Sequence, residues 1–217
     1  MARVLITWGG WTGHEPDKVA ALFAGWVRDA GAEVAVHDTL ACFDDPAALA
    51  AVDLIVPVWT MSTIGKEQAL NVAAAVAAGT GLAGCHGGMC DAFRDNVDWQ
   101  FMTGAQWVAH PGNDGVRYRV RITSDDALVA GVGDFEMVTE QYYLHLDPVV
   151  KVHAVCDFPV ADGPHAVNGP VAMPVVFTKG WGKGRVYYNA LGHQANVMDH
   201  GPAATLMQRG LHWAMRR

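Results

Sequence analysis

The first 90 residues alternate short apolar runs with amphipathic stretches, and this alternation restricts the fold more than any other feature of the sequence. Four runs have the length and β-rich composition of strands: Val4–Trp8, Glu33–His37, Asp53–Trp59 and Gly81–Cys85. Two stretches between them have the apolar spacing of helices: Asp17–Ala30 and Gly65–Ala78. Because strands joined by helices make right-handed crossovers, the sequence predicts an α/β fold, with a mostly parallel sheet and helices on both faces.

After His86 the pattern changes and predicts shorter elements. A short helix is expected over Asp91–Asn96 and a last helix over Ala203–Met215. Strands are expected at Val116–Ile122, Phe135–Val138, Lys151–Cys156, Val171–Phe177 and Arg185–Asn189, with a tight turn at Gly180–Gly184. The additional strands of this C-terminal half should be antiparallel or mixed. No repeat or linker interrupts the 217 residues, so we expect a single domain over residues 1–217.

Composition excludes several classes of protein. Hydrophobic residues make up 51% of the chain and charged residues 17%, which supplies a core and excludes a disordered chain. Lys and Arg number 15 against 22 Asp and Glu, a net charge of −7 without a basic block, so no nucleic acid is expected as a partner. Gly79 and Gly81 interrupt the longest apolar-rich run, Asn71–Gly84, so no membrane span is expected. We therefore expect a cytoplasmic protein, and a homodimer as the commonest closed oligomer.

The four cysteines favour reduced thiols over a disulfide framework. Cys42, Cys85, Cys90 and Cys156 include no Cys-x-x-Cys pair of the kind found in zinc or redox sites. Cys85 or Cys90 beside a histidine such as His193 would suit a thiol-dependent hydrolase, which alkylation should inactivate. Buried structural thiols are the competing interpretation, because Cys85 precedes the centre of its turn and should point into the sheet.

Polar side chains follow several predicted strands, at the edge where parallel sheets bind ligands. The loop after the first strand contains Trp11 and His14, a later loop contains Thr60, and His86 and His193 each follow a further strand. Glycines in these loops allow the backbone to approach a ligand closely. The sequence therefore predicts one shared site at this edge.

The most informative loop is Gly84-Cys85-His86-Gly87-Gly88, which has the form of the sharp strand-to-helix turn that exposes a nucleophile in elbow-type enzymes. Here the central residue is histidine. Asp91 follows this turn, and polar segments further along supply His110, Glu140 and Tyr142. Such groups suit acid–base catalysis.

A metal site is a second interpretation of the same residues. Neutral imidazoles and carboxylates bind zinc-like divalent ions, and the candidate ligands are His14, His86 and His193. No local signature such as His-Glu-x-x-His places two of them on one helix face. This prediction therefore depends on convergence of the strand ends.

The order and spacing of several segments resemble the ThuA-like family, named for trehalose utilisation, over nearly the whole chain. The resemblance is carried by the loop with Gly10, Trp11 and His14, by Asp53–Trp59 with Lys66-Glu67-Gln68, and by Gly81–His86, Asp91-Ala92-Phe93, Gly104–Pro111, Glu140-Gln141-Tyr142, Pro174–Phe177 and Gly182–His193. It implies a flavodoxin-like, class I glutamine amidotransferase-like fold. Amidotransferases of this fold have a cysteine nucleophile where this chain has His86, so the resemblance argues against glutamine hydrolysis. It implies instead a role in the metabolism of trehalose, related disaccharides or their 3-keto derivatives.

The resulting hypothesis is an enzyme of carbohydrate catabolism that acts on a sugar or 3-keto-glycoside. His86, His193 and Glu140 are expected to be catalytic, by acid–base or metal-assisted chemistry. The residues expected to bind the sugar are Trp11, His14, Thr60, Asp91, His110 and Tyr142, with the rings of Trp11 and Tyr142 as platforms. A non-catalytic sugar-binding or regulatory module is the alternative, because fold alone does not determine function.

Overall fold

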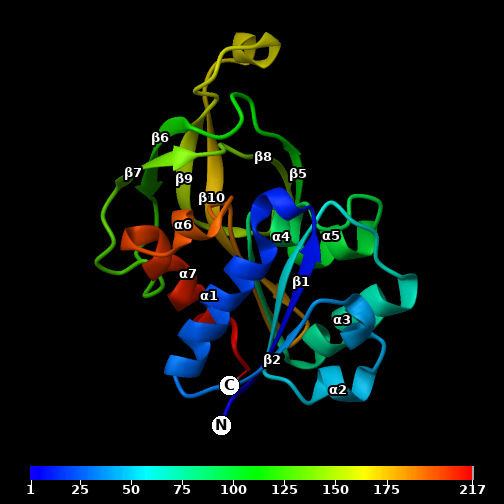
Figure 1. Ribbon diagram of the computed structural model, residues 1–217. Coiled ribbons are helices and arrows are strands. Elements are labelled where there is room, and N and C mark those ends of the chain that lie inside the picture. The colour runs from blue at the N-terminus through cyan, green and yellow to red at the C-terminus, as the bar shows by residue number, and fades with distance from the viewer. Residues whose placement is uncertain (217) are drawn as a thin grey trace.

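The computed structural model describes residues 1–216 and is built on one large sheet (Figure 1). The strands are β1 Arg3–Gly10, β2 Glu33–His37, β3 Leu54–Thr60, β4 Gly81–Cys85, β5 Ala105–Ala109, β6 Val116–Ile122, β7 Phe135–Thr139, β8 Tyr143–Leu146, β9 Lys151–Phe158, β10 Val171–Trp181 and β11 Gly184–Asn189. Nine of these strands form the large sheet in the order β2-β1-β3-β4-β11-β10-β9-β6-β7, and β5 pairs with β8 in a small second sheet.

The large sheet has a parallel half and an antiparallel half. Strands β2, β1, β3, β4 and β11 pair in parallel, whereas β11, β10, β9, β6 and β7 pair in antiparallel fashion. Strand β11 therefore joins the two halves. The predicted α/β class, with additional antiparallel strands in the C-terminal half, is confirmed.

Helices cover both faces of the parallel half. The α-helices are α1 Pro16–Asp29, α2 Pro46–Ala50, α3 Lys66–Ala78, α4 Gly87–Cys90, α5 Val97–Thr103, α6 Ala195–Met198 and α7 Gly201–Ala214. Short 3-10 helices are η1 Thr12–His14, η2 Leu40–Phe43 and η3 Pro164–Asn168. Helices α1 and α7 contact each other on one face, and α3 contacts α2 and α5 on the other (Figure 1). Among the described residues, no helix has the length and apolarity required to cross a bilayer.

The sequence explains strand β3 and helix α1 directly. Strand β3 is buried along Leu54–Val58, as a parallel strand covered on both faces must be. Helix α1 begins with Pro16 in its first turn, where a missing N–H costs nothing, and buries an apolar stripe that includes Val19 and Phe23. The chain then turns at Gly31, whose φ of 86° suits glycine.

The predicted helix over Asp91–Asn96 is wrong. The chain is helical before this segment in α4 and after it in α5. The reason is capping: the side chain of Asn96 accepts a hydrogen bond from the backbone N–H of Trp99, so a new helix begins there. The predicted turn at Gly180–Gly184 is too wide, since β10 continues to Trp181, which pairs with Gly184.

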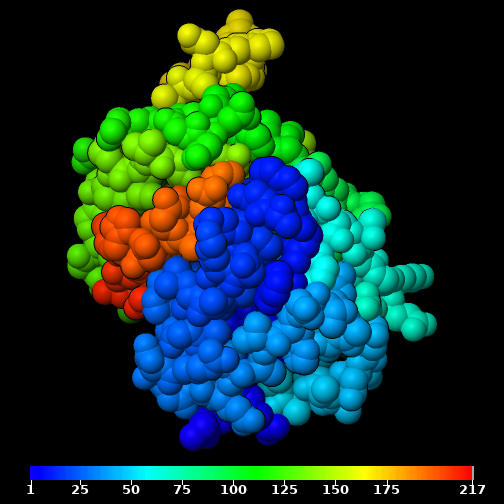
Figure 2. Space-filling model, in the orientation of Figure 1, coloured from blue at the N-terminus to red at the C-terminus, as the bar shows by residue number. Residues whose placement is uncertain are grey.

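An arm formed by β9 and β10 extends beyond the body of the molecule. The two strands remain paired as far as Phe158 and Val171, and the segment between them carries η3 at the tip. Figure 2 shows this tip as a knob that stands apart from the rest of the surface. Sequence reasoning predicts the two strands but not their projection.

A buried lysine connects the small sheet to the large one. Nζ of Lys179, on β10, donates a hydrogen bond to Oδ2 of Asp147 at 2.7 Å and another to the backbone carbonyl of Phe101. The ammonium also lies 4.6 Å from the ring centroid of Phe101 and 5.4 Å from that of Trp181. Because Asp147 follows β8 and Phe101 belongs to α5, one side chain joins three elements.

Candidate functional site

Four ionisable side chains from distant parts of the chain meet beyond the carboxyl ends of the parallel strands. His14 follows β1, His86 follows β4, Glu140 follows β7 and His193 follows β11. Each offers one ligand atom, and these atoms all lie within 4.8 Å of one another. All four side chains are buried, with at most 7% of their surface exposed. We call these residues the histidine–glutamate cluster.

His14 is positioned by a tight contact between its loop and the end of β3. The backbone N–H of Trp11 donates to the carbonyl of Thr60 at 3.0 Å, and Nδ1 of His14 lies 3.0 Å from Oγ1 of the same threonine. This approach requires glycine at position 10, where φ is 78° and a Cβ would lie 1.9 Å from the Thr60 carbonyl oxygen. Thr60 therefore positions His14.

His86 occupies the centre of the sharp turn between β4 and α4. Its backbone has φ 48° and ψ −136°, a conformation that a non-glycine residue adopts only when the surroundings enforce it. Two contacts do so: its N–H donates to the carbonyl of Asn189 at 2.7 Å, and the Tyr188 hydroxyl donates to its carbonyl at 3.0 Å. Glycine at position 87 leaves room for the His14 ring, which a Cβ would approach to 2.6 Å.

Glu140 lies between the imidazoles. Its Oε2 is 3.0 Å from Nε2 of His86 and 3.3 Å from Nδ1 of His193. The first distance is that of a hydrogen bond or of two groups that share a ligand, and Nδ1 of His193 is buried without a hydrogen-bond partner in the described structure. Nδ1 of His110 lies 3.9 Å from Oε1 and is likewise buried without a partner.

Burial and mutual contact shift the pKa values of the cluster in opposite directions. Burial lowers the pKa of His86, and together with the neighbouring imidazoles it lowers that of His14 to about 3, so both rings are neutral. Burial raises the pKa of Glu140, but the contacts with His193 and His86 outweigh it and hold this pKa well below its ordinary value. Burial lowers the pKa of His193, yet Glu140 outweighs it and raises this pKa. The cluster thus holds a carboxylate beside one imidazole that favours its charged form.

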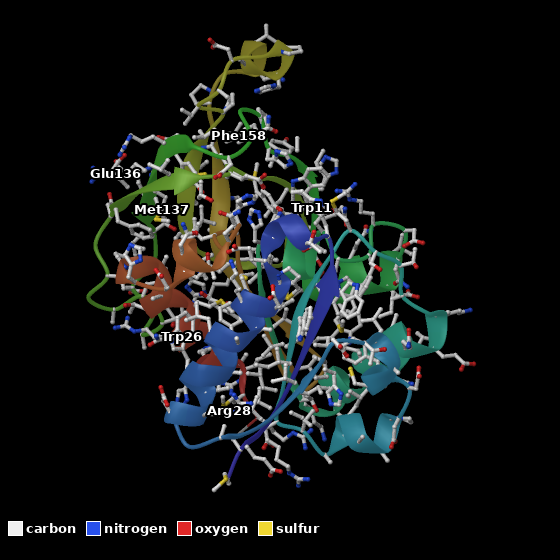
Figure 3. The ribbon with its side chains drawn as sticks, in the orientation of Figure 1. Trp11, Trp26, Arg28, Glu136, Met137 and Phe158 are labelled. Carbon is white, nitrogen blue, oxygen red and sulfur yellow. The ribbon has the colours of Figure 1, made fainter. Side chains whose placement is uncertain are left out.

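The rim of the cluster is aromatic. Trp11 is 46% exposed and lies edge-on to His14, with ring centroids 4.8 Å apart. Figure 3 shows Trp11 beside η1, at the carboxyl end of the sheet. Tyr142 is buried and stacks on His86 at 3.8 Å, so its ring supports that imidazole and does not form an open platform. The side chain of His110 is 30% exposed and forms another part of the rim.

Asp91 has a partner that the sequence analysis missed. Arg94 donates to both of its carboxylate oxygens, with Nη2 at 2.9 Å from Oδ2. Arg94 also lies over the ring of Trp107, 4.4 Å from its centroid. Helical spacing could not have revealed this pair, because the chain is not helical between Cys90 and Val97.

The cysteines are placed as structural thiols. Cys85 is buried and its Sγ lies under Gly192, where a Cβ would approach it to 2.9 Å. Burial raises the pKa of Cys85 to about 12 and that of Cys90 well above its ordinary value. Neither thiol is activated as a nucleophile.

We expect iodoacetamide to label Cys42 alone in the native protein, at neutral to mildly alkaline pH. Cys42 is partly exposed, whereas Cys85, Cys90 and Cys156 are buried. A pKa of about 12 for Cys85 corresponds to roughly a thousandfold less thiolate than the ordinary value gives. Mass spectrometry should find one label per chain, none after Cys42→Ser and four in denaturant. Labelling of Cys85 or Cys90 with loss of activity would instead support the thiol-dependent hydrolase.

A cavity elsewhere does not compete with the cluster as the candidate site. It has a volume of about 720 Å³ and lies at the opposite end of the strands, near Ala2 and Trp213. Two arginines that line it, Arg209 and Arg216, donate hydrogen bonds to backbone carbonyls and so have structural roles. The strongly perturbed histidines lie at the cluster, and perturbed pKa values mark functional sites.

Comparison with known proteins places the chain among sugar-related proteins. The family model ThuA, described as trehalose utilisation, matches residues 3–214. A solved structure from Bacteroides uniformis described as ThuA-like has 14% identity and a TM-score of 0.76, with coverage of 98% of this chain and 91% of its own. A cytoplasmic protein from Salmonella typhimurium LT2 has 13% identity and a TM-score of 0.70, with coverage of 99% and 100%.

A β-galactosidase from Rahnella sp. R3 is also similar, with 18% identity and a TM-score of 0.64 over all of this chain but only 32% of its own. At these identities the structural likeness shows the fold alone. No curated protein matches the sequence.

Proposed function

The chain belongs to the ThuA family, described as trehalose utilisation, and from this premise we propose that it is an enzyme of carbohydrate catabolism that acts on a sugar or keto-glycoside at the histidine–glutamate cluster. The family supports a carbohydrate-related role. The chemistry is inferred from the cluster.

One observation carries this proposal: Glu140, His86, His14 and His193 are buried together at the edge of the sheet where ligands bind. Burying ionisable groups costs stability, and apolar side chains of similar volume would often serve the fold as well or better. A carboxylate with a strongly lowered pKa beside an imidazole with a raised one is an arrangement suited to chemistry.

The cluster fits proton removal next to a carbonyl. Glu140 favours the charged form of the His193 imidazole. This positive charge would stabilise the negative charge that develops on a carbonyl oxygen of the substrate. The side chain of His110 is 30% exposed at the rim, so its imidazole is the group proposed to accept the proton from the adjacent carbon. The electrons of that C–H bond then move toward the carbonyl. The sugar is isomerised when the proton returns to the former carbonyl carbon and the hydroxyl proton of the reacting carbon moves to the former carbonyl oxygen. It undergoes elimination when the carbonyl re-forms, a double bond forms to the next carbon, and the C–O bond on that carbon breaks, with the leaving oxygen taking the proton.

Trp11 is the proposed platform for the sugar ring. Its indole is exposed beside the cluster, and apolar faces of sugar rings pack on such surfaces (Figure 3). Asp91 is buried and held by Arg94, and its expected contribution to sugar binding stays a proposal.

The test is incubation of the protein with trehalose and its 3-keto derivative in D₂O, followed by NMR of the recovered sugar. Proton removal next to the carbonyl should introduce deuterium at that carbon in the keto-sugar, even without net conversion. The His86→Gln and His110→Gln variants should reduce this exchange. If the sugar binds but is recovered unaltered and without deuterium, the protein is a sugar-binding module and the proposed enzymatic function is wrong.

A further inference from the structure

We propose that His14, His86, His193 and Glu140 form a binding site for one divalent transition-metal ion of the zinc class. The proposal deepens the proposed function, because it identifies the positive charge that faces the substrate. It rests on that function only for the role of the ion, since ion binding can be measured without any sugar.

The hydrogen bonds of His86 give the first argument. Its Nδ1 lies 2.8 Å from the carbonyl oxygen of Ala190, which can only accept, so Nδ1 carries the hydrogen. In the neutral ring, Nε2 then presents its lone pair to Oε2 of Glu140 at 3.0 Å. Two acceptors, here an imidazole nitrogen and a carboxylate oxygen, approach to this distance only when a proton or a metal ion binds both of them.

His193 gives the second argument. Its Nδ1 is buried, lies 3.3 Å from the same Oε2 and has no hydrogen-bond partner in the described part of the chain. An unpaired buried polar atom is costly, and it is expected where a ligand completes its bonding. A metal ion among Nε2 of His86, Nδ1 of His193 and the Glu140 carboxylate would satisfy all three at once.

The spacing of the groups suits a coordination shell. Zinc takes histidine nitrogens and carboxylate oxygens at roughly 2.0–2.2 Å, which puts the ligand atoms of a tetrahedral shell about 3.3–3.6 Å apart. The four ligand atoms lie within 4.8 Å of one another, so the longest separation shortens by about 1 Å when the shell forms. The ring centroids of the three imidazoles are also evenly separated, by 4.8, 5.0 and 5.4 Å.

The hydrogen-bond partners of the second ring nitrogens of His86 and His14 are of the kind found in metal sites. A metal-bound histidine commonly donates its second ring N–H to a backbone carbonyl or a polar side chain, which orients the ring. His86 has the Ala190 carbonyl in this position, and His14 has the Thr60 hydroxyl. Three imidazoles with one carboxylate favour a zinc-class ion over magnesium or calcium, which prefer oxygen ligands.

The bound ion would act as a Lewis acid toward a sugar carbonyl or hydroxyl. His14 and His193 keep 7% and 6% of their surface exposed, and Trp11 and His110 are the more exposed side chains next to them. A substrate oxygen would approach from that side.

The experiment uses protein without a histidine tag, stripped with chelator and then dialysed against Zn²⁺, Co²⁺, Mn²⁺ or Ni²⁺ separately. We expect one Zn²⁺ or Co²⁺ per chain by elemental analysis, and a visible Co²⁺ absorption band. Both should be lost in Glu140→Gln and in His193→Gln. A matched control is His153→Gln, since His153 is equally buried but bonds to Ser124 and Thr178 away from the cluster. This variant should retain the ion.

The possible results separate the two proposals. Stoichiometric metal that the control retains and the cluster variants lose supports the site, even when no sugar is altered, in which case only the proposed function fails. Folded wild-type protein that binds none of the four ions overturns the site. Metal that persists in folded Glu140→Gln and His193→Gln proteins overturns it as well. If the sugar still exchanges deuterium after complete removal of metal, the proposed function stands and the ion takes no part in it. Circular dichroism of each variant establishes folding, and where a variant does not fold, the Co²⁺ spectrum of the wild type decides.

Discussion

Replacing Glu140 with glutamine is expected to lower kcat on the natural sugar by about 10²–10⁴-fold, the range for loss of a catalytic proton-transfer or charge-stabilising group. Glutamine has the same shape but no charge. It cannot hold a positive charge between His86 and His193, whose ring nitrogens lie 3.0 and 3.3 Å from Oε2. Steady-state kinetics on purified variants measures the effect.

Glu136 provides the matched control for this change. It lies on β7, the strand that leads to Glu140, and its side chain is exposed (Figure 3). Glu136→Gln removes the same charge from the strand that leads to Glu140 and should leave kcat within twofold. Equal kcat in Glu140→Gln and wild type would show that the cluster takes no part in the reaction.

Replacing Asp147 with asparagine is expected to destabilise the protein by about 3 kcal/mol, near the lower end of the cost of removing one partner from a buried ion pair. The Lys179 ammonium keeps its carbonyl partner, Phe101, but loses the only carboxylate that it contacts in the described structure. For a chain of this size the loss should lower Tm by roughly 6–12 °C. Thermal and urea unfolding monitored by circular dichroism measure it.

The control is Asp126→Asn. Asp126 pairs with Lys151 at 2.6 Å, but that lysine side chain is 61% exposed. Such a surface pair is worth less than about 1 kcal/mol. Equal effects of the two substitutions would contradict a special role for the buried lysine.

The pH dependence of the Asp147 effect has a definite sign. The hydrogen bond from Lys179 lowers the pKa of Asp147 in the folded protein. A lowered carboxyl pKa stabilises the fold at any pH above the unfolded value of about 3.9, and this stabilisation is lost as the pH falls toward the folded value. The stability difference between wild type and Asp147→Asn should therefore stay constant from pH 7 to pH 5 and shrink below about pH 4.

The parallel half of the fold could be predicted because its first four strands are short β-rich runs separated by helical patterns or turns. The expected strand Gly81–Cys85 matches β4 residue for residue, and Asp53–Trp59 differs from β3 by one residue at each end. The small sheet of β5 and β8 was missed. Its strands lie in segments rich in polar and aromatic residues, which we interpreted as loops.

The site was predictable to the same extent. His14, His86 and His193 follow strands of the parallel half, so the rule for strand ends brings them together. Glu140 follows β7, the last strand in the sheet order, and no periodicity shows that the chain then crosses back to the cluster. The bonds that position the imidazoles, from Thr60 and the Ala190 carbonyl, depend on loop conformation and could not be predicted.

The central place of β11 has a consequence for how the molecule assembles. This last strand of the described chain lies between β4 and β10, and its residues pair with strand residues about a hundred positions earlier. Until β11 pairs with β4 during folding, β4 exposes an unpaired apolar edge, and folding intermediates aggregate through surfaces of this kind. Such distant pairing is also slow to form. The seam that β11 closes carries His86 on one side and His193 on the other, so the histidine–glutamate cluster forms only at the step that completes the sheet.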